Sequence, residues 1–495
     1  MTRRRRANSP EVEVTLARQA GGALGWSLLN TAASKVGTLV IGIALARILG
    51  PEEFGTFAVA MVALLAVLSF NELGVSLAIV RWKRDPASII PTVATISVVT
   101  SLALFAACWA ATPAYTAAMG SPQSTPVVRV LLIAILVNGV SAAPAALLQR
   151  EFRQRERMIS DQSNAWLGAG VSIMLALSGM GAMSLALGRL AGSVVGALLF
   201  LRYVPSAFRL GLDRSQVRPL LRFGLPLAGA SIIVFASSYA DQLIAGMVLG
   251  PTQLAFYVLA FNLASWPIAV LSQPLRSVAP AAFARMQSDP VLMARNLVWV
   301  VGLLAAVSFP VCFVLAGAAP AVTRVVYGVQ WEPAGVPLAA LGVLAAVRIV
   351  LELSYDYLVV LRRTGAILLI QLAWLAALVP TVLLGANRWG IGGVAVGQVV
   401  VAAAIVLPLY LWRLSAAGVA ASRFVGRLVL PTGVGLALYA VSLVLVERLR
   451  SDLLAIALSA VVGLVAILAM LAREPAALSA VTGRFRRRPA QVGAS

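Results

Sequence analysis

About fourteen apolar segments, each close to 20 residues long, follow one another along this 495-residue chain. A segment of this length can cross the hydrocarbon of a bilayer as a helix, because a helix bonds every backbone amide within its own segment. Hydrophobic residues make up 60% of the chain and charged residues only 12%, which excludes a water-soluble globular protein. The sequence therefore predicts an all-α polytopic membrane protein.

The boundaries of the fourteen predicted transmembrane helices follow from hydropathy and are placed to within several residues. The spans are 22–48, 54–79, 88–110, 127–148, 163–181, 184–204, 223–249, 253–274, 295–317, 335–361, 365–385, 390–412, 426–446 and 453–472.

The segments that connect the spans alternate between strongly basic and nearly uncharged. Membrane proteins concentrate arginine and lysine on the cytoplasmic side, and most of the 39 basic residues fall on one set of alternate connections and on the two ends. This asymmetry predicts a multi-pass protein with both termini in the cytoplasm. It also explains the net charge of +21 through membrane lipids, without a nucleic-acid partner. The arginine-rich start is followed by polar sequence and predicts a cytoplasmic tail, not a cleaved signal peptide.

An internal repeat groups the spans into two lobes. Leu49-Gly50-Pro51 ends the first span, and Leu249-Gly250-Pro251 ends the seventh. Repeats that run in the same direction are a transporter architecture, with the substrate site between the lobes. We predict two pseudo-symmetric six-helix lobes plus two C-terminal helices, with 207–222 read as an amphipathic surface segment or an ordinary basic loop. The predicted divisions are an N-terminal tail 1–20, an N-lobe 21–206, a cytoplasmic linker 207–222, a C-lobe 223–413, the last two helices 414–472, and a basic tail 473–495.

Ionisable residues inside a span cost several kcal/mol and are candidates for function. Three of them, in span ten, are spaced at i, i+4 and i+8 and share one helical face. Arg189 and Glu72 lie nearer the ends of their spans. Snorkelling offers a structural explanation for Arg189, and nearby basic residues offer one for Glu72. The candidates are Lys35 in span one, Glu72 in span two, Arg189 in span six, Asp241 with its neighbour Gln242 in span seven, and Arg348, Glu352 and Asp356 in span ten.

Two interpretations of span ten stay open. Arg348 and Glu352 could neutralise each other within the helix, or the face could line a hydrated cavity in which Glu352 or Asp356 binds a proton or a cation. Lys35 has no acidic residue one turn away, which favours a cavity position facing an anionic substrate group, such as the pyrophosphate of a carrier lipid. Pairing of Lys35 with Asp241 across the lobes is the alternative.

The sequence offers little for catalysis. It has no histidine, and Cys108 and Cys312 both lie in apolar runs, so neither a metal site nor a disulfide is predicted. No Walker motif is present, which argues against direct ATP coupling. The outer connections 111–126 and 318–333 are short, so a polyprenyl-glycan polymerase or ligase is disfavoured. We predict no enzyme, no catalytic residue and no cofactor, beyond H⁺ or Na⁺ coupling through Glu352, Asp356 or Glu72.

Several short motifs carry a family resemblance. They are Ala46-Arg-Ile-Leu-Gly-Pro-Glu-Glu-Phe-Gly55 with Glu72-Leu-Gly74 and Ala78-Ile-Val80, then Leu147-Leu-Gln-Arg-Glu-Phe152, Leu221-Arg-Phe-Gly-Leu-Pro226, Pro280-Ala-Ala-Phe283 with Arg285, and Tyr327-Gly328 with Trp331 and Ala334. In this order they resemble the oligosaccharide and polysaccharide flippases of the multidrug/oligosaccharidyl-lipid/polysaccharide exporter superfamily. Ser34-Lys35-Val36 also resembles a Ser-Arg-Val-like stretch of the lipid II flippases, with lysine in place of arginine.

The resemblance implies an all-helical, two-lobed transporter that works by alternating access. It implies the transfer of undecaprenyl-diphosphate-linked oligosaccharide to the outer leaflet for cell-surface polysaccharide. The substrate-binding candidates are then Lys35, Arg348, Asp241, Gln242 and Arg189. Membrane lipids, the lipid-linked glycan, and glycosyltransferases or a polymerase of the same pathway are the expected partners of a monomer. A lipid II flippase, a drug/cation antiporter of the same superfamily, and a structural membrane scaffold are the alternatives.

Overall fold

The computed structural model of the chain describes residues 37, 40–71, 76–81 and 86–473. Within this part, regular secondary structure is entirely helical, and the first described helical stretch covers 40–48. The all-α fold expected from the sequence is thereby confirmed.

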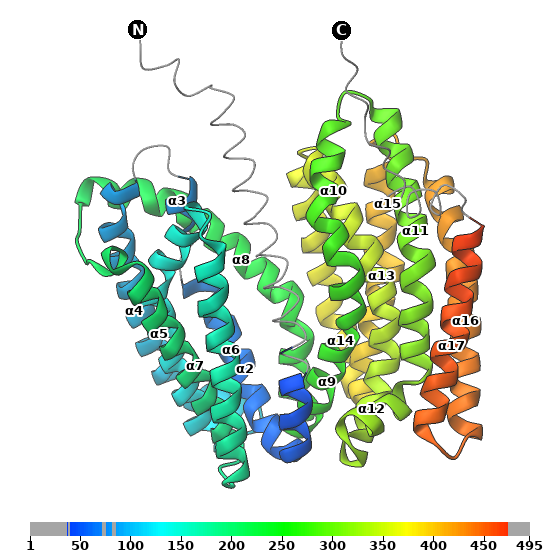
Figure 1. The fold of residues 1–495 in the computed structure, drawn as a ribbon, viewed down its shortest axis with the longest axis horizontal. Coiled ribbons are helices and arrows are strands. Elements are labelled where there is room, and N and C mark those ends of the chain that lie inside the picture. The colour runs from blue at the N-terminus through cyan, green and yellow to red at the C-terminus, as the bar shows by residue number, and fades with distance from the viewer. Residues whose placement is uncertain (1–36, 38–39, 72–75, 82–85, 474–495) are drawn as a thin grey trace, which may run out of the picture. The chain divides into compact units, whose positions relative to one another are not determined.

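Contacts divide the chain into two compact units, residues 1–258 and 259–495, and each is described by itself. Figure 1 shows the long helices of each unit lying side by side. Unit 1 holds α2 (Pro51–Asn71), α3 (Ser76–Arg81), α4 (Ile90–Ala118), α5 (Thr125–Arg150), α6 (Gln154–Leu177), α7 (Ala182–Tyr203), α8 (Arg214–Leu249) and the start of α9 (Pro251–Ala264). Unit 2 continues with α10 (Gln273–Arg285), α11 (Pro290–Gly317), α12 (Ala319–Tyr327), α13 (Gly335–Val360), α14 (Thr364–Val401), α15 (Leu407–Ser415), α16 (Ala421–Arg448) and α17 (Asp452–Ala472).

Ten of the described helical stretches are long and apolar enough to cross a membrane. One of them, 364–415, has 52 residues and covers two of the predicted spans. Its length would be about 78 Å as one helix, far more than the hydrocarbon thickness of about 30 Å. The backbone breaks inside it at Trp389 and Gly390, where Gly390 has a φ of 60°. Predicted spans eleven and twelve therefore meet at this kink, and a total of fourteen spans is compatible with the structure.

The segment between α7 and α8 is hydrogen-bonded to α4. A 3₁₀ turn covers Pro205–Phe208, and α8 begins at Arg214, so 207–222 contains no separate surface helix. The backbone N–H of Gly211 donates to the Thr95 hydroxyl at 3.0 Å, and the N–H of Asp213 donates to the Thr92 hydroxyl at 3.1 Å. Asp213 then caps α8 by accepting from the hydroxyl and the backbone N–H of Ser215, and these hydrogen bonds lower the pKa of its carboxyl. The predicted division at 222/223 thus falls inside a continuous helix.

The two Leu-Gly-Pro segments have the same local role. Each ends one helix and places its proline first in the next, α2 at Pro51 and α9 at Pro251. A proline at the first helical position loses no intrahelical bond, because the N–H there has no partner in the helix. Gly250 between α8 and α9 has a φ of 83°, a conformation that favours glycine. The predicted duplication itself stays a prediction.

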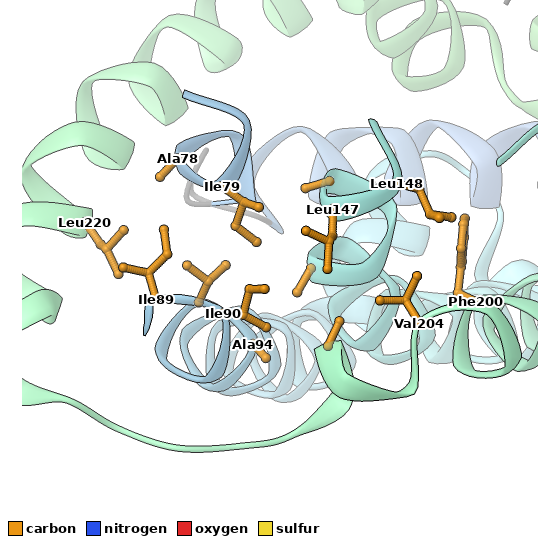
Figure 2. Close-up of a cluster of buried hydrophobic side chains, with 14 residues drawn as sticks. Ala78, Ile79, Ile89, Ile90, Ala94, Leu147, Leu148, Phe200, Val204 and Leu220 are labelled. Carbon is orange, nitrogen blue, oxygen red and sulfur yellow. The ribbon is translucent and has the colours of Figure 1, made fainter. Parts of the chain in front are cut away.

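One of the hydrophobic clusters of unit 1 brings the short helix α3 together with the ends of longer helices. Figure 2 shows buried side chains from α3, α4, α5, α7 and α8 that turn into a common interior. The short helix α3 contributes Ile79, and the start of α8 contributes Leu220, both fully buried. Arg150 at the end of α5 donates from its guanidinium to the Ile79 carbonyl at 2.5 Å. These contacts hold the short helix against the bundle.

Glycines let α6 and α7 approach each other closely. A Cβ on Gly168 would lie 2.9 Å from the Gly188 carbonyl oxygen and 3.4 Å from the Gly192 Cα. Both neighbours are backbone atoms, which cannot rotate away as a side chain can. Small residues are the usual means by which membrane helices pack, since lipid provides no hydrophobic drive between them.

This packing gives a first prediction. Gly168→Ala should destabilise the folded protein by about 2 kcal/mol, because the added methyl group must push α6 and α7 apart. Gly170→Ala on the same helix is the control, since no atom lies within 4 Å of its Cβ position. Thermal unfolding in detergent should show a lower midpoint for Gly168→Ala only. Equal midpoints for the two variants would contradict the close contact.

A cluster of charges fixes the C-terminal helix in unit 2. Arg324 of α12 donates to both carboxylate oxygens of Asp452, at 2.9 and 2.7 Å, and to Glu332 at 2.7 Å. The hydrogen bonds to Asp452 are the main reason that the pKa of Arg324 is raised above its ordinary value. Because Asp452 is the first residue of α17, the pair ties that helix to α12.

Candidate functional site

Two carboxylates of α13 share one cation from α10. The Nε of Arg276 donates to Asp356 Oδ2 at 2.6 Å, and Nη2 donates to Oδ1 at 3.0 Å. The Nη1 of the same side chain lies 3.1 Å from Glu352 Oε2, which also accepts from the Ser272 hydroxyl at 3.1 Å. We call Ser272, Arg276, Glu352 and Asp356 the Arg276 network. A bidentate guanidinium–carboxylate pair is among the stronger polar contacts in proteins.

The network is partly withdrawn from the surroundings. The side chains of Arg276, Glu352 and Asp356 are 29%, 23% and 11% exposed, and Ser272 is fully buried. Helix α15, which carries the buried Tyr410, also packs against α13. Separating these charges would leave an unpaired ion in a weakly solvated place, which is costly.

Irregular helical geometry positions the network. A π-helical segment, Ile268–Ser272, precedes α10 and contains Ser272, and a second one, Ala402–Val406, precedes α15. Both pack against α13. Single π turns recur at functional sites in helices, because they shift the register of the side chains that follow. The edge-to-face contact of Phe283 with Tyr357, whose ring centroids are 5.5 Å apart, holds α10 on α13.

Arg348 does not form the predicted ion pair with Glu352. Among the described residues no ion pair joins Arg348 to Glu352, although the two are one turn apart. The Arg348 guanidinium lies over the ring of Phe261, 5.8 Å from its centroid, a cation–π contact. The interpretation of span ten as a self-neutralising Arg348–Glu352 pair is therefore wrong. Glu352 meets the cation of a different helix, because α10 packs directly on α13.

In unit 1 two neighbouring polar residues of α8 are buried. Asp241 is 0% exposed and Gln242 is 4% exposed. The Tyr257 hydroxyl of α9 donates to Asp241 Oδ2 at 2.6 Å. Asp241 thus bonds across the Gly250 junction, within unit 1. Its suggested contact with substrate stays a prediction.

The other candidates are more scattered. Arg189 is an exposed residue of α7 and belongs to unit 1, as does Asp241. Lys35 and Glu72 lie outside the described residues, so their predicted roles remain predictions. Among the six candidates that lie within the described residues, Glu352 and Asp356 are brought together through Arg276.

Arg276 is the residue that sequence reasoning missed. It lies just after predicted span 253–274, in a connection whose basic residues the charge pattern assigns to the cytoplasm. The available signal was the pair of acids one turn apart on span ten, which together require more positive charge than Arg348 alone. The Arg276 network contains two carboxylates and one guanidinium, so it carries an excess of negative charge. A proton could bind one of the carboxylates, and another anion could compete with them for Arg276. Within the described residues no cluster of three or more metal-ligating side chains is found.

Sequence comparison finds relatives of this chain. The family described as polysaccharide biosynthesis protein matches residues 44–336. The lipopolysaccharide biosynthesis protein WzxC of Escherichia coli (strain K12) is 24% identical over 384 residues, which are 76% of this chain and 77% of that protein. The succinoglycan biosynthesis transport protein ExoT of Rhizobium meliloti (strain 1021) is 26% identical over 353 residues, which are 69% of each.

Solved structures share the fold. The inward closed conformation of the lipid II flippase MurJ aligns with a TM-score of 0.76 and 12% identity, over 92% of this chain and 99% of MurJ. An inward-facing multidrug resistance MATE family transporter aligns with a TM-score of 0.62 and 17% identity, over 78% of this chain and 95% of the transporter. These similarities show the fold alone, whereas the family match covers more than half of the chain. The chain belongs to the polysaccharide biosynthesis protein family.

Proposed function

We propose that this multi-pass membrane protein is a flippase that moves a polyprenyl-diphosphate-linked oligosaccharide across the bacterial cytoplasmic membrane for cell-surface polysaccharide synthesis. The observation that carries the proposal is the family match over 44–336, supported by relatives named for lipopolysaccharide biosynthesis and succinoglycan transport. The fold shared with a lipid II flippase is compatible with alternating access. Both termini are proposed to be cytoplasmic, from the distribution of arginines.

The Arg276 network suggests how a phosphorylated headgroup could act on unit 2. A diphosphate offers the same bidentate acceptor geometry as a carboxylate, so it can compete with Asp356 for the guanidinium. Protonation of Glu352 or Asp356 would weaken the same pairs and favour that exchange. A ligand shifts a conformational equilibrium only by binding two states differently, and a network that gains or loses its internal pairs provides such a difference. We propose that H⁺ or Na⁺ coupling, where it occurs, acts through this network.

Two related functions are weaker alternatives. A lipid II flippase would share the fold, but the family match and the relatives concern polysaccharide biosynthesis. A drug/cation antiporter would need an acidic residue that is free to bind its substrate, whereas Glu352 and Asp356 are paired with Arg276.

Transport in reconstituted vesicles tests the proposal. The purified full chain is placed in liposomes with a polyprenyl-diphosphate oligosaccharide whose sugar can be cleaved by a membrane-impermeant glycosidase. We expect about half of the sugar to be protected in empty liposomes and nearly all to become accessible with the protein. Liposomes that instead contain lipid II or a fluorescent organic cation serve as comparisons. Protection that persists for the oligosaccharide, together with movement of either comparison substrate, would reject the proposed substrate class.

A further inference from the structure

A second charged site lies away from the Arg276 network. A cavity of about 1070 Å³ opens between the first turns of α11 and α16 in unit 2. Arg295 and Trp299 of α11 line it from one side, and Arg423 and Arg427 of α16 line it from the other. None of the described residues that line it is acidic. The cavity is therefore strongly cationic and has an aromatic wall.

Two of these arginines have no carboxylate partner among the described residues. Arg295 and Arg423 are exposed, and neither forms an ion pair with a carboxylate in the described part of the chain. Arg423 and Arg427 are one turn apart on the same face of α16, where like charges repel. The aliphatic stem of Arg427 packs on α11, with its Cδ 3.2 Å from the Cβ position of Gly302. Such an arrangement gains stability when an anion enters.

The start of α16 adds to the positive potential. This 28-residue helix begins at Ala421, and Ala420 before it provides no side-chain hydrogen bond to the first amides. Ala420 itself lines the cavity. The first amides of a helix have no intrahelical acceptor and carry partial positive charge, so they favour an anion nearby.

The surroundings of the cavity suit a lipid. Val291 at its edge is 79% exposed, and Val298 of α11 also lines it. On α16 the exposed Leu430 shares a helical face with Arg423 and Arg427. Trp299 is of the residue type that prefers the membrane interface. Both helices begin on the side that the arginine distribution assigns to the cytoplasm, where anionic phospholipids attract basic groups. The cavity therefore combines phosphate-binding groups with apolar surface for acyl chains.

The cavity is distinct from the Arg276 network. Helix α11 packs against α13, which carries the network, and also against α16. Figure 1 shows α11 between these two helices in unit 2. A ligand held at α16 is thus separated from Glu352 and Asp356 by a helix, which fits a lipid that stays bound better than a substrate that must move on.

We propose that this cavity binds the headgroup of an anionic glycerophospholipid of the cytoplasmic leaflet as a resident lipid. The guanidinium groups of Arg295 and Arg423 would bond the phosphate oxygens, and the acyl chains would lie along Val298 and Leu430. Arginine suits this role because its planar fork matches the geometry of a phosphate group. The site would anchor the α11–α16 pair to the membrane surface.

Native mass spectrometry of the full chain in detergent tests the site. The wild type, titrated with phosphatidylglycerol, should form a one-to-one complex, and phosphatidylcholine should bind at least about tenfold more weakly. Arg295→Gln/Arg423→Gln should lower the affinity for phosphatidylglycerol by at least about tenfold, since each guanidinium supplies charge-assisted hydrogen bonds. Arg448→Gln, at the opposite end of α16, is the matched control and should bind as the wild type does.

Three results would overturn the proposal: unchanged phosphatidylglycerol binding by the double variant, equal loss in Arg448→Gln, or equal binding of phosphatidylcholine. Displacement of phosphatidylglycerol by a polyprenyl-diphosphate oligosaccharide at an equal concentration would also overturn it, by assigning the cavity to the transported lipid. Thermal unfolding without lipid checks that the double variant folds. If it does not, Arg423→Gln alone is titrated against the same two lipids and the same limits apply.

Discussion

Arg276→Met is expected to abolish transport of the lipid-linked oligosaccharide and to destabilise the protein by roughly 3 kcal/mol. The substitution keeps an apolar stem of similar length but leaves Glu352 and Asp356 without their common cation. Both carboxylates are less than a quarter exposed, so solvent replaces the lost pairs only in part. Transport is measured in vesicles, and stability by thermal unfolding in detergent.

Two further variants separate structure from function at this network. Arg285→Met, near the end of the same helix, removes an exposed arginine and should leave both measurements unchanged. Arg276→Met combined with Glu352→Gln and Asp356→Asn removes all three charges, and should recover stability without recovering transport. If the triple variant recovered transport as well as stability, the Arg276 network would have only a structural role. Wild-type stability and transport in Arg276→Met alone would contradict the pairing itself.

Gly55→Ala is expected to have the second largest effect, a loss of about 3 kcal/mol of stability with reduced yield of folded protein. In unit 1 a Cβ on Gly55 would overlap the carbonyl group of Pro251 and would approach the Thr252 nitrogen at 3.1 Å. All of these are backbone atoms at the start of α9, so relief requires α2 to move away from the α8–α9 junction.

Gly50→Ala provides a control only five residues away. No atom lies within 4 Å of its Cβ position, so the substitution should change the unfolding midpoint little. Both variants are compared by the amount of monodisperse protein after solubilisation and by the unfolding midpoint. A Gly55→Ala protein that behaves as Gly50→Ala does would show that α2 and the start of α9 are not in close contact at Gly55.

Sequence and structure agree best where a property is local. Predicted spans 295–317 and 453–472 correspond to α11, Pro290–Gly317, and α17, Asp452–Ala472. Hydropathy over 20 residues determines such helices, because a lipid environment requires each segment to satisfy its own backbone. The helix starts at Pro51 and Pro251 also follow from local chemistry, since proline fits the first turn and glycine the junction before it.

The sequence patterns did not predict which residues far apart in the chain form pairs. Glu352, which helical spacing offered as the partner of Arg348, pairs instead with Arg276 of α10, as Asp356 does. Similarly, Glu53 of α2 accepts a hydrogen bond from the Ala182 N–H at 2.6 Å and caps α7, a contact between residues far apart in the sequence. Periodicity shows which residues share a helical face, but it does not show which helix that face meets.

By itself, the sequence determined the class of protein, the positions of most spans and the family, because these depend on composition and short motifs. The tertiary structure decided which cation neutralises Glu352 and Asp356, and it showed that three arginines converge on one cavity between α11 and α16. Electrostatic interaction weakens with distance, so a charge acquires its partner only when helix packing brings the two within a few ångströms.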